Sequence, residues 1–134
     1  MGPMLAHLKT HRELGLLHAE SYVYWRGALV QYWRSFEQLE RFARDPALTH
    51  LDAWRHFNKS VGADGSVGIW HETYLVAEGQ YECIYGNMPR KGLALAGEHL
   101  PARGARETAK RRLGRPGEPA VPSYENPGSG PASG

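Results

Sequence analysis

Apolar residues near the start of the chain follow first a helical and then a strand spacing. Between Met4 and Leu14 they recur three or four residues apart, and Gly15 follows as a suitable left-handed cap, which predicts a helix over residues 4–14. Residues 16–25 (LLHAESYVYW) then alternate, and residues 28–34 return after a tight turn at Arg26–Gly27. This pattern predicts a β-hairpin.

Two helices are expected next, each opened by a capping pattern. Ser35 with Gln38 opens the first, which Asp45–Pro46 ends, and Thr49 with Asp52 opens the second, which ends near Gly62. The buried stripes are expected at Phe36, Leu39, Phe42 and Ala43 and at Leu51, Trp54, Phe57 and Val61.

A second pair of strands is predicted over residues 67–76 and 80–87, joined by a turn at Glu78–Gly79, with a loop or short helix over 90–102. The order helix, hairpin, helix pair, hairpin indicates an α+β fold, with a ferredoxin-like antiparallel sheet and helices on one of its faces. Both strand parities carry large apolar groups, such as Trp70 and Ile69, so the second face also needs cover. We therefore expect a homodimer that packs sheet on sheet.

Composition and charge divide the chain at about residue 103. Residues 1–102 hold ten Lys/Arg against eleven Asp/Glu, whereas residues 103–134 hold six against three, together with five of the nine prolines. We expect 1–102 to be the folded domain and 103–134 a basic, Pro/Gly-rich and largely disordered tail. A nearly neutral folded part argues against nucleic acid as a partner.

Cysteine usage and hydropathy indicate a cytoplasmic protein. Cys83 is the single cysteine, so neither an intrachain disulfide nor a cysteine-based zinc site can form. No apolar run approaches the roughly 18 residues that a membrane span needs, and the first residues do not have the pattern of a secretory leader. We expect no membrane partner.

The segments GIWHETY (68–74) and YECIYGNMP (81–89) resemble a bacterial and fungal monooxygenase-like family related to an oxygenase of the fumagillin pathway. Three further stretches share the likeness: VQYWRSFEQLERFARD (30–45), HLDAWRHFNKSVG (50–62) and KGLALAG (91–97). The resemblance covers roughly residues 15–114. It implies a dimeric α+β barrel that oxidises a small organic molecule.

The chain departs from that family at its start. Members begin with an extra strand and the first part of a helix, whereas this chain starts inside that helix near Met4, so we expect the first strand to be absent. A misassigned start, a sheet that closes differently and a strand supplied by a partner all remain open as explanations.

Candidate site residues lie on the second predicted helix and on the strands after it. An oxygenase without a cofactor needs a base for an electron-rich phenol or enol, a group that holds the oxyanion, and an aromatic-lined pocket. Imidazole suits the base because its charge changes near neutral pH. His71, His50, Glu72 and Asn58 are the catalytic candidates, and Trp54, Trp70, Tyr74, Tyr85 and Asn87 the substrate-binding candidates. Each also has an ordinary structural interpretation, as a helix-end, core or sheet residue.

Three functions compete at this stage. The leading hypothesis is a monooxygenase-like domain that oxidises a small aromatic or polyketide-like molecule, with no cofactor predicted. A haem-binding enzyme is the second, because related barrels bind haem through one histidine, and a non-catalytic ligand-binding or assembly domain is the third. His7 and His11 have the spacing of a metal pair but no third ligand, so no metal site is predicted.

Overall fold

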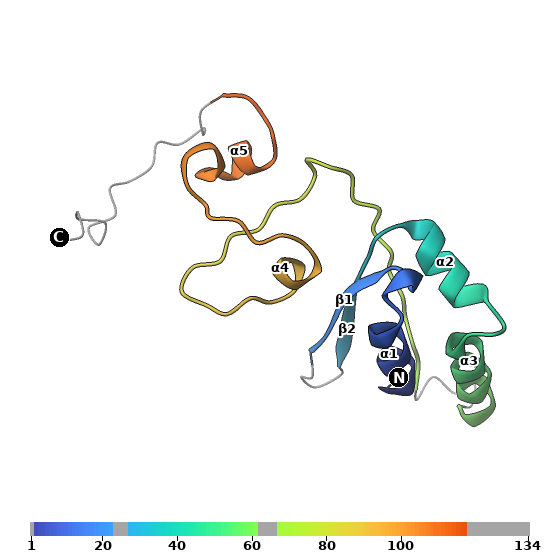
Figure 1. The fold of residues 1–134 in the computed structure, drawn as a ribbon. Coiled ribbons are helices and arrows are strands. Elements are labelled where there is room, and N and C mark those ends of the chain that lie inside the picture. The colour runs from blue at the N-terminus through green and yellow to red at the C-terminus, as the bar shows by residue number, and fades with distance from the viewer. Residues whose placement is uncertain (1, 23–26, 62–66, 118–134) are drawn as a thin grey trace. The chain divides into compact units, whose positions relative to one another are not determined.

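The computed structural model describes residues 2–22, 27–61 and 67–117 and has an α+β arrangement (Figure 1). The chain divides into two compact units, the first of Met1–Leu75 and Tyr85–Leu100 and the second of Val76–Ile84 and Pro101–Gly134. The first unit contains the sheet and the longer helices. The α+β class predicted from the hydrophobic pattern is thus confirmed.

The sheet of the first unit is the predicted hairpin. Strand β1 (Leu16–Tyr22) pairs antiparallel with β2 (Ala28–Trp33), with Glu20 opposite Val30. A bulge between Leu16 and His18 shifts the register, so that Leu16 still points to the core. The predicted turn at Arg26 lies outside the described residues.

The first predicted helix forms two pieces. Helix α1 (Gly2–Thr10) ends before His11, and a 3-10 turn, η1 (Arg12–Leu14), leads to Gly15 at φ +97°. Glycine is favoured there because other residues rarely adopt a positive φ. The predicted cap is correct, and the Gly15 carbonyl accepts from the Arg34 amide at 3.0 Å, so the cap also closes the end of the hairpin.

The helix pair follows the sequence prediction with two corrections. Helix α2 (Phe36–Arg44) begins as expected, because Ser35 accepts a hydrogen bond from the Gln38 amide at 3.2 Å, but Phe36 is exposed and only Phe42 of the predicted stripe is buried. The N-cap of helix α3 (Thr49–Ser60) is Leu48, one residue before the predicted cap.

A small core joins the helices to one face of the hairpin. Met4, Leu8, Leu16 and Phe42 are buried together, and Leu8 is fully enclosed. Trp33 packs against this cluster, with its ring centroid 5.6 Å from that of Phe42. The opposite face of the hairpin contacts helix α4 (Leu93–Ala96) of the same unit.

The predicted second hairpin is not formed. Residues 67–75 and 85–87 of the first unit, like residues 76 and 80–84 of the second, carry no strand assignment, although Gly79 has the expected turn conformation, with φ +75°. Alternating apolar residues form a strand only where a neighbouring strand supplies backbone hydrogen bonds. The ferredoxin-like sheet and the dimeric barrel therefore stay predictions.

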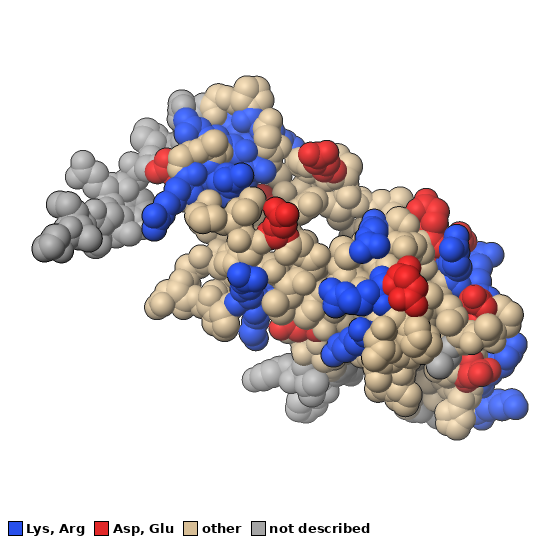
Figure 2. Space-filling view, viewed as in Figure 1, with Lys and Arg blue, Asp and Glu red and all other residues tan. Residues whose placement is uncertain are grey.

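The second unit includes short helical turns within the segment that we expected to be disordered. These are η2 (Gly104–Arg106) and α5 (Ala109–Arg112), and residues 118–134 lie outside the described part. Arg112 holds the unit together, since its Nε donates to Glu82 at 2.8 Å and one terminal nitrogen donates to the carbonyls of Arg106 and Glu107. Lys and Arg side chains gather over this segment (Figure 2). No described helix has the length and apolar character needed to cross a membrane.

Candidate functional site

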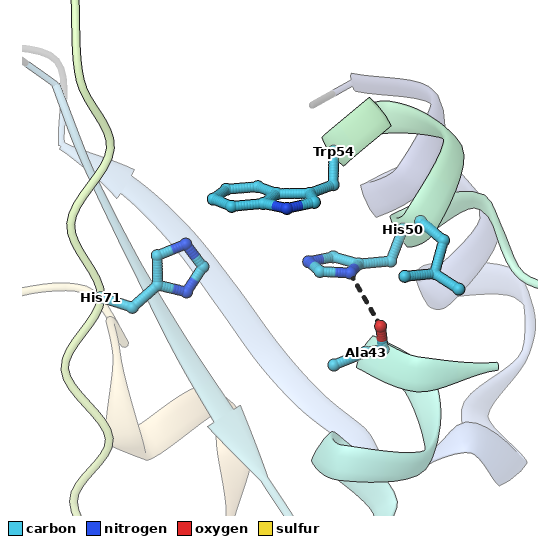
Figure 3. Close-up of a pocket in the computed structure, with 5 residues that line it drawn as sticks. Ala43, His50, Trp54 and His71 are labelled. Atoms are coloured by element: carbon cyan, nitrogen blue, oxygen red, sulfur yellow. Dashed lines mark hydrogen bonds between the residues drawn. The ribbon is translucent and has the colours of Figure 1, made fainter. Parts of the chain in front are cut away.

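A hollow of about 330 Å³ lies in the first unit, between the helix pair and the extended segment 67–75. Its lining residues are Ala43, His50, Leu51, Trp54 and His71. Ala43 comes from the end of α2, the next three from the first turns of α3, and His71 from the extended segment (Figure 3). The volume is at the lower end of the range for small-molecule pockets.

The short connection between α2 and α3 positions His50. Asp45 ends α2, its carboxylate accepts from the Ala47 amide at 2.8 Å, and α3 starts four residues later, which brings the two helices into contact. The Nδ1 atom of His50 lies 3.1 Å from the Ala43 carbonyl oxygen. Because a carbonyl oxygen only accepts, Nδ1 donates this bond, which leaves the other ring nitrogen, Nε2, for another partner.

Trp54 and His71 form adjoining walls of the hollow. Their ring centroids are 6.4 Å apart and nearly perpendicular, at 84°. Figure 3 shows the His71 ring facing the His50 ring, with the Trp54 indole alongside both. Two imidazoles and an indole around an otherwise apolar hollow suit a planar molecule with one polar group.

The other candidates on the extended segment bond to one another instead of lining the hollow. Tyr74 donates its hydroxyl to Glu72 at 2.7 Å. Hydrogen bonds from Tyr74 and, second, from Trp70 hold the pKa of Glu72 below its usual value, and the same Glu72 bond raises the pKa of Tyr74. A lowered pKa makes the Glu72 carboxylate a weaker base, and Glu72 is exposed and does not line the hollow, so the structure does not bring it together with His50.

The remaining three candidates lie away from the hollow. Asn58 follows Trp54 by one turn of α3 but is exposed and does not line the hollow. The Tyr85 hydroxyl donates to the Lys91 carbonyl at 2.6 Å and accepts from the Ala94 amide at 3.2 Å, which is a structural role. Asn87 has φ +48°, a conformation that asparagine tolerates in turns.

Sequence reasoning missed Ala43 and Leu51 as pocket residues, because both had been assigned to buried stripes. The available signal was the four-residue gap between the two helices, which places the end of α2 beside the start of α3. For His7 and His11, the rings stack with centroids 4.1 Å apart. Within the described ranges no group of three or more His, Cys, Asp or Glu side chains is placed to hold a metal ion.

Comparison with known proteins places these residues within one family. The family model described as "Monooxygenase af470-like" matches residues 1–93, which include every residue of the hollow. The curated protein "Monooxygenase af470" of Aspergillus fumigatus is 34% identical over 89 residues, a stretch that covers 60% of this chain and 30% of that relative. This chain therefore spans less than a third of the curated relative's length, and no solved structure matches it. The match over more than two thirds of the sequence shows that the chain belongs to the monooxygenase af470-like family.

Proposed function

We propose that the hollow between α3 and the extended segment binds a small aromatic or polyketide-like phenol or enol and promotes its oxidation by dioxygen. The observation that carries this proposal is the anchored His50 ring, whose Nδ1 is bound to the Ala43 carbonyl while Nε2 is left for a substrate proton. Family membership supports monooxygenase-like chemistry.

The proposed reaction needs dioxygen as its only co-reactant. His50 Nε2 removes the hydroxyl proton, and the resulting electron-rich anion transfers an electron to dioxygen. The substrate radical and superoxide then combine through a new carbon–oxygen bond, and His50 returns its proton to the peroxide. The resulting hydroperoxide loses water as its oxygen–oxygen bond breaks. One oxygen atom enters the substrate, the other leaves in water, and the substrate gives up two hydrogens. In this reaction Trp54 stacks on the aromatic ring of the substrate, and His71 faces the oxyanion that develops on the substrate.

Substitution of His50 tests the base. His50→Asn keeps a donor near the Ala43 carbonyl but removes the basic nitrogen, so oxygen uptake with a panel of polyphenols is expected to fall about 10²–10⁴-fold. His56→Asn is the matched control, because His56 is an exposed residue of the same helix. Unchanged oxygen uptake in His50→Asn would refute the role of His50.

Haem binding by the same fold is the alternative with a cofactor. A haem needs a histidine ligand and partners for its two propionates, and the hollow offers His50 or His71 but no Lys or Arg among its lining residues. The lining therefore fits a small neutral aromatic molecule better than haem. A Soret band on haem titration that is lost in His71→Ala or His50→Ala would reverse this preference.

A non-catalytic ligand-binding or assembly domain that uses the same hollow is the other alternative. Ligand binding is expected to quench Trp54 fluorescence whether the domain is an oxygenase or a binding module, whereas only an oxygenase consumes dioxygen. Quenching without oxygen uptake would identify a binding module.

We propose in addition that the protein acts in the cytoplasm as a homodimer. The support for the homodimer is the extended segment 67–75, on which Trp70, Tyr74 and Leu75 are each about three-quarters exposed. Large apolar side chains exposed close together in this way are typical of interaction surfaces. Light scattering coupled to size exclusion tests the dimer, and a strictly monomeric mass at high concentration contradicts it.

A further inference from the structure

The last turn of α2 contacts the His50 ring through two consecutive residues. The Phe42 ring lies 5.8 Å from the His50 ring, centroid to centroid, at an interplanar angle of 58°. The carbonyl oxygen of the next residue, Ala43, accepts the hydrogen bond from His50 Nδ1 at 3.1 Å (Figure 3). One imidazole is thus held by a hydrogen bond at Nδ1 and by a neighbouring aromatic ring.

Phe42 connects the His50 ring to the core of the first unit. Its side chain is buried in the cluster that joins α1, α2 and the hairpin, with only 3% exposed. Its ring also lies 5.6 Å from the ring of Trp33 on β2. Both separations lie within the range of roughly 4.5–7 Å that interacting aromatic rings adopt. A ring enclosed in this way has little freedom to move, so it gives His50 a fixed neighbour.

The Asp45 side chain determines which donor reaches the Ala43 carbonyl. This carbonyl is one of the last of α2, for which the helix itself supplies no amide. The amide four residues later, that of Ala47, would bond to it if the helix continued, but this amide donates to the Asp45 carboxylate at 2.8 Å. The Ala43 carbonyl is therefore left for His50.

A single hydrogen bond does not fix the position of an imidazole. It sets the direction of Nδ1 but lets the ring turn about the line that joins Nδ1 to the carbonyl oxygen, and this rotation moves Nε2. The Phe42 ring limits the rotation, so the bond and the ring contact together fix where Nε2 points. A base must lie within hydrogen-bond reach of the proton that it takes, and a displacement of about 1 Å can lower a rate about 100-fold.

We propose that Phe42 and Asp45 are positioning residues that aim His50 Nε2 into the hollow. Phe42 holds the plane of the ring from the core, and Asp45 keeps the Ala47 amide away from the Ala43 carbonyl. Neither side chain is among the residues that line the hollow, so both act through His50. The inference rests on the role of His50 in the proposed function, and it assigns to the end of α2 the orienting group that a catalytic base requires.

Three substitutions in the full chain separate the two contacts. Phe42→Leu keeps an apolar side chain in the core but removes the ring. Asp45→Ala releases the Ala47 amide to the Ala43 carbonyl, whereas Asp45→Asn keeps an oxygen that accepts from this amide. Phe36→Leu is the matched control for the first change, because Phe36 belongs to the same helix and is 45% exposed. Thermal unfolding shows which variants keep their fold, and the Asp45 pair carries the test if Phe42→Leu does not.

The first readout is the tautomer of the neutral His50 ring, from long-range nitrogen–proton NMR correlations at a pH where titration of the ring is complete. The Nδ1–H form is expected to dominate in the unmodified chain, in Asp45→Asn and in Phe36→Leu, because the Ala43 carbonyl accepts only from a protonated Nδ1. Phe42→Leu and Asp45→Ala are expected to give a mixture of both tautomers. Unchanged signals in these two variants overturn the inference, and a mixture in Asp45→Asn as well overturns the role of the Asp45 oxygen.

The second readout is oxygen uptake with the polyphenol panel used for His50→Asn. Phe42→Leu is expected to lower kcat about 10–100-fold and Asp45→Ala about 3–10-fold, with KM unchanged, because the hollow still binds the substrate while the base is misaligned. Asp45→Asn is expected to restore most of the rate. A rise in KM with kcat unchanged contradicts the positioning role. If the unmodified chain consumes no oxygen, the proposed function fails, and the tautomer of His50 alone decides whether Phe42 and Asp45 position the ring.

Discussion

The fully enclosed Leu8 gives the sharpest test of the core that supports the site. Leu8 of α1 is 0% exposed and packs with Met4, Leu16 and Phe42. Leu8→Ala removes three buried carbons, worth about 2.4 kcal/mol of transfer free energy, and leaves a cavity that raises the loss to about 3 kcal/mol. The flexible side chain of Met4 can fill part of that cavity, which sets the expected loss of unfolding free energy at about 2–3 kcal/mol.

Such a loss is large for a unit with so small a core. It corresponds to a fall of about 8–24 °C in Tm, because each kcal/mol shifts the Tm of a domain this size by roughly 4–8 °C. Thermal and urea unfolding followed by circular dichroism measure it. Leu95→Ala, at a position 45% exposed on α4, is the control, and is expected to stay within about 0.5 kcal/mol of the unmodified chain. If Leu8→Ala loses no more stability than this control, α1 does not pack on the hairpin and the described core is wrong.

Three further predictions concern hydrogen bonds. Ser35→Ala removes the cap of α2 and is expected to lower the unfolding free energy by about 1 kcal/mol, whereas Ser35→Thr keeps most of it in urea unfolding. Tyr74→Phe is expected to raise the depressed pKa of Glu72 in a carboxyl NMR titration. A carboxyl group whose pKa is depressed by folding stabilises the folded state above its unfolded pKa, and this stabilisation is lost as the pH falls through the folded pKa. The Tyr74→Phe variant is therefore expected to lose less stability on acidification than the unmodified chain. An unchanged Glu72 titration contradicts this prediction. Arg112→Lys keeps the positive charge but cannot keep the geometry of the three hydrogen bonds that Arg112 donates. Faster amide exchange at residues 104–113 is therefore expected. Unchanged exchange would show that Arg112 does not hold the second unit together.

Part of the candidate site could be predicted from residue spacing in the sequence. His50 and Trp54 share a helix face because they are four residues apart, so their common position followed from the sequence. His71 required the tertiary structure, since nothing local says which helix an extended segment will lie against. Asn58 shares the same spacing as His50 and Trp54, yet it lies beyond the hollow, because a face on a helix is longer than the pocket it meets.

The sequence by itself determined the elements with local signals: the first hairpin, the Ser35 cap, the Gly15 cap and the end of α2 at Asp45. The caps depend on hydrogen bonds between residues three or four positions apart, and the hairpin joins two strands that are neighbours in the sequence, so local residue types specify both. The tertiary structure decided what depends on distant partners. Residues 67–75 alternate like a strand but have no assigned neighbour, and Glu20 reaches Gly92 across 72 positions. Alternation sets which side chains share a face, but only the packed chain decides which distant segment covers that face.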